Sequence, residues 1–237
     1  SRLRRSLHEL SMESPADDQT IESIQRELIE RNKVDEGVVY LQVTRGAADR
    51  DFAFPKKSKP SLVLFTQAKR ILDNPAAESG LSILTVDDIR WGRRDIKTVA
   101  LLAASMAKMS AIESGADDAW LVDGDGNITE GSSFNAYIVA DDGTIITRNL
   151  SNDILHGITR KAVLRLAGEN EVKVVERAFS LAEAYRAKEA FITAAGVFVL
   201  PVVRIDNNTI GDGKPGQIYT KLRRFYIEMV MEQAERG

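Results

Sequence analysis

The chain has 237 residues, of which 43% are hydrophobic and 28% charged, and its formal net charge is −3 at pH 7. This length allows one large domain or two small ones, and the interleaved charges give no basic surface for nucleic acid or an anionic membrane. The absence of cysteine excludes disulfides and thiolate metal sites, and His8 and His156 lie too far apart in sequence to suggest a metal site. No apolar run approaches the roughly 20 residues that span a bilayer, and the composition fits a cytoplasmic enzyme.

We predict a small α/β domain in residues 1–72. An apolar stripe over residues 3–12 is broken at Pro15, and apolar residues at helical spacing predict a helix over residues 17–32. Residues 38–45 and 61–66 are rich in β-branched and aromatic residues, which favours two strands. The sequence starts inside an amphipathic run without a capping residue, so we expect the front of this domain to be truncated or unseen.

A larger domain is predicted over residues 76–237, after a linker at residues 73–75 in which turn formers precede a proline. Its expected elements are a strand over 82–89, a mostly buried helix over 98–114, hairpins over 119–128 and 136–147, a helix from 158, strands over 190–193 and 198–205, and a helix over 217–235. Strands that arrive mostly in hairpins, with helices between them, predict a mixed α+β domain.

Lys97 stands close in sequence to three arginines, Arg90, Arg93 and Arg94. Nearby positive charge disfavours a protonated amine, so we expect Lys97 to lose its proton more easily than a free lysine does. A neutral amine is a nucleophile toward carbonyl groups. The alternative is a solvated surface lysine, because most lysines are exposed.

Two further sequence motifs contain candidate functional residues. TEGSSFN, residues 129–135, contains Glu130, which is either a functional carboxylate or an acid in a turn. LHGITR, residues 155–160, places Gly157, Ile158 and Thr159 at a predicted helix start, where backbone N–H groups and the helix dipole attract phosphate. The alternative for Thr159 is an ordinary helix cap, and the two roles are compatible.

Together and in this order, RWGRRDIK (residues 90–97), TEGSSFN and LHGITR resemble the fold-type IV aminotransferases that use pyridoxal 5′-phosphate. The first phrase is most similar to the D-amino-acid aminotransferases. The resemblance covers nearly the whole chain. It implies a two-domain fold-type IV enzyme, of α/β and α+β class, that pairs as a homodimer.

The resemblance assigns the cofactor chemistry to a lysine and a carboxylate. Lys97 would hold the cofactor aldehyde and move a proton between the substrate Cα and the cofactor C4′. Glu130 would keep the ring nitrogen protonated, because a carboxylate beside the ring stabilises its positive charge. Ser132, Ser133 and Asn135 would hold Glu130 through hydrogen bonds.

The same resemblance implies a phosphate site that joins the helix start at residues 157–159 to Arg2. A further contact is expected from Ala194 and Ala195. The family often has a hydroxyl at the position of Ala195, so here only backbone N–H groups would bind phosphate. Leu155 would pack against one face of the cofactor ring.

Substrate binding is implied for Arg50, which matches the arginine that holds the substrate α-carboxylate in D-amino-acid aminotransferases. A planar bidentate donor suits that role. Phe52 stands where the best-fitting members have a histidine, which removes a donor and adds apolar surface. Arg90 would add a second positive group, and Phe198 would make one wall bulky.

The expected function is transfer of an amino group between a D-amino acid, such as D-alanine, and an α-keto acid, such as pyruvate or 2-oxoglutarate. Because of Phe52, an (R)-selective amine transaminase and a branched-chain amino acid transaminase stay open. A non-catalytic remnant that binds a phosphate ligand is an alternative of another class. A lyase of the same fold, acting on an aminated chorismate, is the last alternative.

Overall fold

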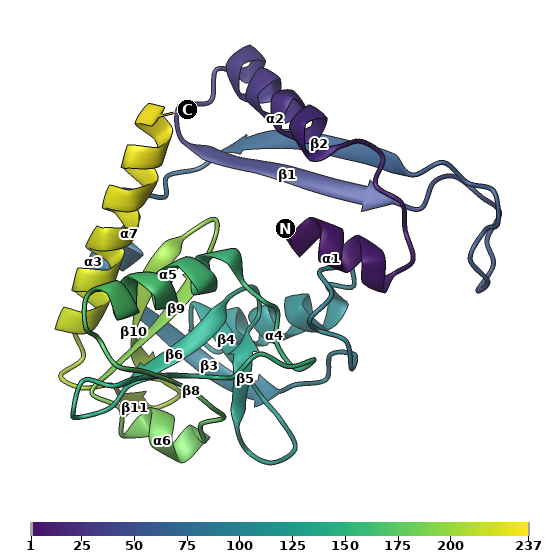
Figure 1. Cartoon of the computed structure of the whole chain (residues 1–237). Coiled ribbons are helices and arrows are strands. Elements are labelled where there is room, and N and C mark those ends of the chain that lie inside the picture. Colours follow the sequence, from purple (N-terminus) through teal and green to yellow (C-terminus); the bar gives the residue numbers. More distant parts are fainter. Residues whose placement is uncertain (1, 237) are drawn as a thin grey trace. The chain divides into compact units, whose positions relative to one another are not determined.

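The computed structural model describes residues 2–236, and the chain divides into two compact units at Ile71 and Leu72. The elements of the first unit are α1 (Arg2–Glu9), α2 (Asp18–Asn32), β1 (Gly37–Thr44) and β2 (Ser61–Ala68) (Figure 1). The helix expected over residues 17–32 and the two expected strands are therefore present. Asp17 caps α2, and its carboxylate accepts a hydrogen bond from Thr20 N at 2.7 Å.

The strands β1 and β2 form an antiparallel hairpin. Asn32 of α2 donates from Nδ2 to Thr66 Oγ1 at 2.8 Å, which fastens the helix to β2. Tyr40 and Phe65 lie directly opposite each other in the hairpin, and their rings stack with centroids 4.6 Å apart. The connecting residues 45–60 form neither helix nor strand, so the hairpin carries a long loop.

The second unit is built on a mixed sheet of nine strands in the order β5-β4-β3-β10-β9-β6-β7-β8, with β11 paired to β10. The pairs β3·β4, β3·β10 and β7·β8 are parallel, and the remaining pairs are antiparallel, which confirms the expected α+β class. The strands are β3 (Leu81–Asp87), β4 (Asp118–Val122), β5 (Ile128–Gly131), β6 (Asn135–Val139), β7 (Ile145–Thr147), β8 (Val174–Glu176), β9 (Glu189–Ala194), β10 (Phe198–Ile205) and β11 (Asn208–Thr209). The helices are α3 (Ala76–Ser79), α4 (Leu102–Glu113), α5 (Ile158–Glu169), α6 (Leu181–Tyr185) and α7 (Gln217–Arg236).

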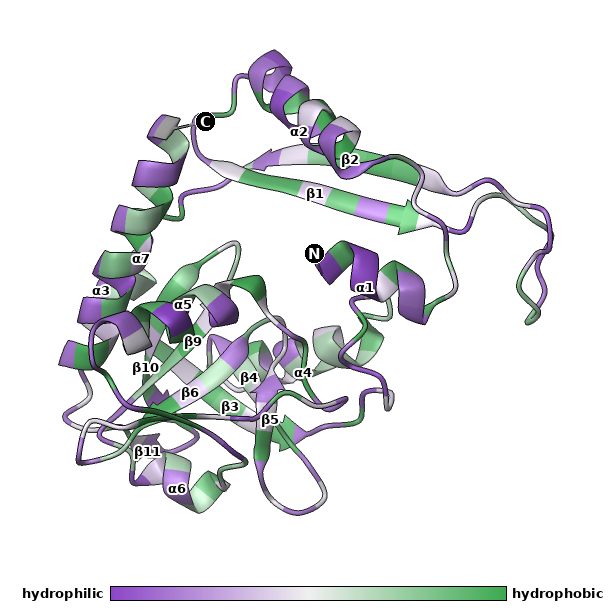
Figure 2. Ribbon diagram, in the orientation of Figure 1, coloured by the Kyte–Doolittle hydropathy of each residue, from purple (hydrophilic) through white to green (hydrophobic). Residues whose placement is uncertain are grey.

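The sheet has an apolar core on each face, because successive side chains of a strand point to opposite sides. In β6, Ala136 and Ile138 join a core with Trp120 and Phe179, whereas Tyr137 packs with residues of α5 and α7. Figure 2 shows the hydrophobic residues gathered in these strands, while α7 alternates between hydrophobic and hydrophilic positions. Within residues 2–236, no helix combines the length and the apolar character needed to cross a membrane.

The helix α4 differs from its prediction in both extent and burial. It begins at Leu102, because the Thr98 hydroxyl accepts a hydrogen bond from Ala100 N and ties the preceding residues into a turn. Only Ala107 and Ala111 are buried, and they pack against β4. The prediction of a mostly buried helix is wrong, because the larger apolar residues of α4 lie on the opposite, exposed face.

The long helix α7 is anchored at its start by Glu189 of β9. The buried Glu189 carboxylate accepts hydrogen bonds from Ile218 N at 3.0 Å and from Tyr219 N at 2.9 Å. These are N–H groups that a helix leaves without intrahelical partners, and the helix dipole favours a negative charge there. A Cβ on Gly216 would lie 1.9 Å from the Glu189 side chain, so only glycine allows this approach.

Replacing Glu189 with alanine is expected to lower the free energy of unfolding by about 1–3 kcal/mol, because two backbone N–H groups lose their acceptor. Denaturant titration of both proteins measures this difference. Glu228→Ala is the control, since Glu228 lies on the same helix in an exposed ion pair with Arg224 and should change stability by less than about 0.5 kcal/mol. Equal effects of the two substitutions would contradict the anchoring role.

Candidate active site

Glu130 of β5 is buried, with 4% of its surface exposed, and three groups donate to its carboxylate. Arg90 Nη1 lies 2.5 Å from Oε1, and Asn135 Nδ2 lies 2.9 Å from Oε2. The Leu155 N–H is shared between the two oxygens, at 3.1 and 3.0 Å. Since an ionised carboxylate offers about four lone-pair sites, these donors fix Glu130 and leave capacity for one more.

The pKa of Glu130 is raised above its usual value as the net result of opposing influences. Burial raises the pKa, because the charged form loses its hydration. The charge of Arg90 and the hydrogen bonds from Arg90 and Leu155 act to lower it, while the negative charge of Asp88 adds to the rise. Arg90 therefore favours the ionised form of Glu130, against the larger effect of burial.

Arg90 bridges two buried carboxylates. Its Nε and Nη2 donate to the two oxygens of Asp88 at 2.9 and 2.8 Å, while Nη1 donates to Glu130. The side chains of Asp88, Glu130 and Arg90 are 0%, 5% and 13% exposed. The substrate contact predicted for Arg90 is therefore replaced by a contact with Glu130, because its guanidinium is already used by these carboxylates.

The neighbouring arginines are also paired. Arg93 forms an ion pair with Asp95 at 2.9 Å, and Arg94 forms one with Asp153 at 3.3 Å. Each positive charge close to Lys97 in sequence thus faces a carboxylate. These carboxylates offset the positive charge of the arginines, and the easier loss of the Lys97 proton stays a prediction.

Asp88 makes a testable contribution to acid stability. Burial alone would raise its pKa, but the hydrogen bonds and charge of Arg90 hold the pKa below its usual value. Ion pairing of Asp88 therefore stabilises the fold fully above the unfolded pKa of about 3.9 and is lost as the pH falls through the lower folded pKa.

We expect Asp88→Asn to lower the free energy of unfolding at pH 7 by about 3 kcal/mol, because Arg90 loses a buried partner. The difference from the unsubstituted protein should shrink as the pH falls from about 5 to about 2. Denaturant titrations over this range measure it. A difference that is constant down to the lowest pH would show that the Asp88 charge does not contribute.

Asn135, the first residue of β6, connects Glu130 to the start of α5. Its buried amide Nδ2 donates to Glu130 Oε2 and, at 3.0 Å, to Leu155 O. A Cβ on Gly157 would lie 2.2 Å from Asn135 Oδ1. The sequence folds locally this way because glycine at position 157 lets the chain pass directly against the Asn135 side chain.

The start of α5 has the features of an anion site. No side chain caps the helix at Gly157. Thr159 is buried, and its Oγ1 has no hydrogen-bond partner among the described residues. Buried hydroxyls are normally satisfied, and the first N–H groups of a helix attract anions. Ile158, between these two residues, is 54% exposed.

Strand pairing brings a third segment to the same end of the sheet. Asn135 of β6 lies opposite Thr193 of β9, and Ala194, which ends β9, and Ala195, in the following turn, come directly after it. Ala194 is half-buried and Ala195 is exposed. Thr193 Oγ1 lies 2.9 Å from the hydroxyl of Tyr137, whose pKa is raised by burial, so this pair is neutral.

Lys97 is an exposed residue in the loop between β3 and α4. The loop is fastened to the segment before α5, because Arg94 N donates to Asn152 O at 3.0 Å. Ile96 is buried, which fixes the residue next to Lys97. The loop of Lys97 is thus anchored to the segment that ends at Leu155, which is half-buried and donates its N–H to Glu130.

The two serines predicted to hold Glu130 do not contact it. Ser132 Oγ donates to Asp118 Oδ1, and the buried Asp118 also accepts from Lys108 Nζ at 2.6 Å. Ser133 is exposed in the turn between β5 and β6. The prediction is wrong for both serines, because the nearest strong acceptor to Ser132 is the Asp118 carboxylate of β4.

Three predicted residues belong to the first unit. Arg2 lies at the start of α1, and Arg50 and Phe52 lie in the loop between β1 and β2. The Arg50 guanidinium stands 5.7 Å from the centre of the Phe52 ring, and Phe52 is 92% exposed. Their roles toward cofactor and substrate stay predictions from the resemblance.

The residues of the second unit fit pyridoxal 5′-phosphate. The buried Glu130 carboxylate has acceptor capacity left for a ring N–H. The partnerless Thr159 hydroxyl and the uncapped start of α5 suit a phosphate group. Among the described residues, no group of three or more histidines and carboxylates is arranged to hold a metal ion.

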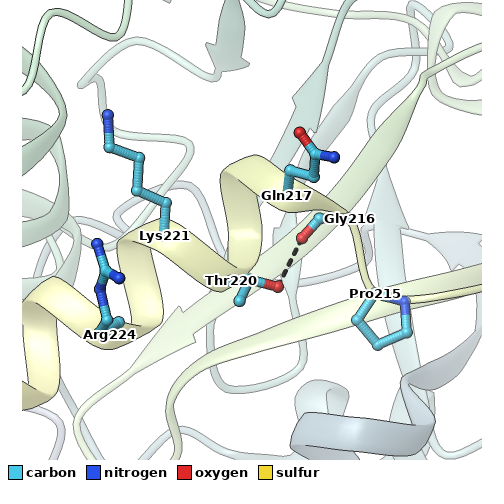
Figure 3. Close-up of a pocket in the computed structure, with 6 residues that line it drawn as sticks. All are labelled: Pro215, Gly216, Gln217, Thr220, Lys221 and Arg224. Atoms are coloured by element: carbon cyan, nitrogen blue, oxygen red, sulfur yellow. Dashed lines mark hydrogen bonds between the residues drawn. The ribbon is translucent and has the colours of Figure 1, made fainter.

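A separate cavity of about 310 Å³ lies at the start of α7 (Figure 3). No residue predicted for the site lines it, and the first N–H groups of α7 already bind Glu189. The cavity is therefore not assigned to catalysis. Its lining consists of Pro215, Gly216, Gln217, Thr220, Lys221 and Arg224.

Asp88, the residue that holds Arg90 beside Glu130, was not predicted from the sequence. A signal was available, because an aspartate two positions before an arginine at a strand end can form a local ion pair. Thr129 was also missed, and its hydroxyl donates to Asp88 Oδ2 at 2.7 Å. The resemblance assigned a role to its neighbour Glu130 but none to Thr129.

Comparisons with known proteins agree on one family. The family model "Amino-transferase class IV" matches residues 1–205. A D-alanine aminotransferase of Staphylococcus aureus (strain MSSA476) is 34% identical over 232 residues, which cover 97% of this chain and 80% of the relative. One of Bacillus licheniformis is 38% identical over 220 residues, which cover 92% and 76%.

Solved structures show the same fold. A branched-chain amino acid aminotransferase of T.th. with pyridoxamine 5′-phosphate is 27% identical, has a TM-score of 0.86, and matches 96% of this chain and 76% of its own. The Escherichia coli branched-chain amino acid aminotransferase, at 20% identity, has a TM-score of 0.87 over 96% and 76%. The fold-type IV prediction is confirmed: this chain belongs to the class IV aminotransferase family.

Proposed function

We propose that the protein transfers an amino group between a D-amino acid, such as D-alanine, and an α-keto acid, such as pyruvate or 2-oxoglutarate. Pyridoxal 5′-phosphate is the cofactor. Two relatives that are 34% and 38% identical to this chain over the aligned residues are D-alanine aminotransferases. The observation that supports the cofactor most strongly is a cluster at one end of the sheet. It consists of Glu130, Asn135, Gly157 and Thr159, whose hydroxyl has no partner among the described residues.

Lys97 and Glu130 are the residues proposed to act on the reacting groups. When bound, the cofactor supplies an electron sink for the electrons released at the substrate Cα. The amine of Lys97 holds the cofactor and moves a proton between the substrate Cα and the cofactor C4′. Glu130 accepts the N–H of the ring and so keeps that nitrogen positive. Donor and acceptor react in turn, which gives ping-pong kinetics.

The phosphate site is proposed at the start of α5. The backbone N–H groups of Ile158 and Thr159 and the Thr159 hydroxyl donate to the phosphate, and Gly157 leaves room for it. Ala194 and Ala195 contribute backbone N–H groups, and Arg2 contributes positive charge by resemblance. Leu155 packs against the ring.

Substrate recognition is proposed for the loop between β1 and β2. Arg50 binds the substrate α-carboxylate as a bidentate donor. Phe52 lies within cation–π range of Arg50, so it can orient the guanidinium, although it cannot donate to the carboxylate as a histidine would.

An assay of three amino donors tests this function. D-alanine, L-leucine and an (R)-aryl amine are each offered with 2-oxoglutarate, and D-alanine is expected to have the highest kcat/KM. A preference for L-leucine would support a branched-chain transaminase, and a preference for the aryl amine an (R)-selective amine transaminase. Pyruvate release without a keto acceptor would indicate the lyase. No turnover with any donor, despite cofactor binding, would identify a remnant.

A homodimer is part of the proposal, and the exposed face of α4 supports it. Leu102, Met106 and Met109 follow one side of the helix and are 75%, 52% and 50% exposed, and Val99 and Leu101 precede them. We expect twice the chain mass by light scattering, and a shift toward the monomer for Met106→Glu. An unchanged dimer would place the interface elsewhere. A cytoplasmic location belongs to the same proposal and is tested by cell fractionation.

A further inference from the structure

We propose that Arg90, held in place by Asp88, is a positioning residue that keeps Glu130 ionised and aligned for the ring nitrogen of the cofactor. This inference rests on the proposed function. It assigns to Arg90 a role through Glu130 rather than a contact with the substrate.

The geometry limits Arg90 to this role. Two of its nitrogens are bound to Asp88, at 2.9 and 2.8 Å, and a third to Glu130 at 2.5 Å. The planar guanidinium therefore fixes the distance and orientation between the two carboxylates. Thr129 also donates to Asp88 Oδ2, at 2.7 Å, so Asp88 itself is held by a second contact.

The charges around Glu130 leave room for one further positive group. Seven connected groups among the described residues, four carboxylates and three guanidiniums, together carry one negative charge in excess. A protonated ring nitrogen placed against Glu130 would balance it. The members are Asp88, Asp123, Glu130 and Asp153 on one side and Arg90, Arg94 and Arg148 on the other.

The charge of Arg90 affects whether the proton shared by Glu130 and the ring nitrogen lies on the carboxyl oxygen or on the nitrogen. Without its charge, burial and the neighbouring Asp88 both favour the protonated form of Glu130. The proton would then stay on a Glu130 oxygen, and the carboxyl would donate a hydrogen bond to an uncharged ring nitrogen. With Arg90 in place, its charge and hydrogen bond lower the pKa of Glu130 against the effect of burial, which favours the ionised carboxylate and a proton on the ring.

Arg94 provides a matched control. It lies four residues after Arg90, its side chain is 14% exposed against 13% for Arg90, and it also pairs with Asp88. Its second carboxylate partner is Asp153, whereas that of Arg90 is Glu130. Replacing either arginine with glutamine should therefore have the same general effect on the charge and stability of this cluster. Only the replacement of Arg90 should change the protonation of the ring nitrogen.

The test is the 15N chemical shift of the ring nitrogen in holoenzyme loaded with 15N-labelled pyridoxal 5′-phosphate, recorded between about pH 6 and pH 9. The unsubstituted protein and Arg94→Gln are expected to show a protonated ring throughout. Arg90→Gln is expected to show an unprotonated ring over at least half of this range, with a fall in kcat of about tenfold or more. Arg90→Lys, which keeps the charge, should restore the protonated signal at the acidic end.

Two outcomes would overturn the inference: a protonated ring in Arg90→Gln, or the same loss of the protonated signal in Arg94→Gln. If Arg90→Gln does not fold, Arg90→Lys decides, because its ring should lose the proton at the alkaline end of this range, where the unsubstituted protein keeps it. An unchanged titration in Arg90→Lys would then contradict the positioning role. Failure of the proposed function is distinct, since it would appear in the unsubstituted protein, either as no signal of bound cofactor or as no amino transfer from D-alanine.

Discussion

Replacing Lys97 with alanine is expected to lower the rate of amino transfer from D-alanine to 2-oxoglutarate by at least about 1,000-fold, because the group that holds the cofactor and moves the proton is lost. Glu130, Asn135 and the start of α5 are untouched by this substitution. The fold and the phosphate site should therefore persist, and the variant should still bind cofactor without covalent attachment. Steady-state kinetics and equilibrium dialysis measure the two quantities.

Lys173→Ala is the control for the loss of an exposed lysine. Lys173 precedes β8 and its side chain is exposed, so its removal should leave the rate within about twofold. If Lys97→Ala retains more than about a tenth of the rate, the amine of Lys97 is not the reacting group, and another lysine has to be sought.

The second large effect is expected from Gly157→Ala. The new Cβ would lie 2.2 Å from Asn135 Oδ1, so Asn135 must move and its hydrogen bond to Glu130 weakens. We expect a loss of about 1–3 kcal/mol in the free energy of unfolding of the apoenzyme, and a rise in the cofactor dissociation constant of about tenfold or more. Denaturant titration and fluorescence titration with pyridoxal 5′-phosphate measure them.

Gly168→Ala provides the contrast within the same helix. A Cβ at Gly168 meets no atom within 4 Å, and alanine is favoured over glycine in a helix by about 0.5–1 kcal/mol. This variant should be slightly more stable and bind cofactor normally. Were Gly157→Ala to behave in the same way, the close contact between Gly157 and Asn135 would not matter for the site.

Local patterns predicted much of the fold. The turn formers at residues 123–127 and 141–143, between strand-like segments, predicted the two hairpins that form β4–β5 and β6–β7. The burial of α4 could not be predicted, because its sequence is apolar on both sides and only tertiary packing selects the side with Ala107 and Ala111. The short elements α3, α6 and β8 have too few residues for a periodic signal.

The site was predictable as a set of motifs but not as a set of contacts. The order of the three phrases singled out Glu130, Asn135 and Gly157, which lie together in the structure. The pairing of Arg90 with Glu130 joins residues 40 positions apart, and neither local propensity nor spacing encodes it. The same limit explains Ser132, which lies close to Glu130 in the chain yet binds Asp118.

Reduction of the holoenzyme with borohydride, followed by peptide mass spectrometry, tests the central claim most directly, because it fixes the cofactor to the amine that holds it. We predict a single modified peptide, with the cofactor mass on Lys97, and its loss in Lys97→Ala. Cofactor attached to a different lysine, or a protein that binds pyridoxal 5′-phosphate without any reducible attachment, would contradict this account.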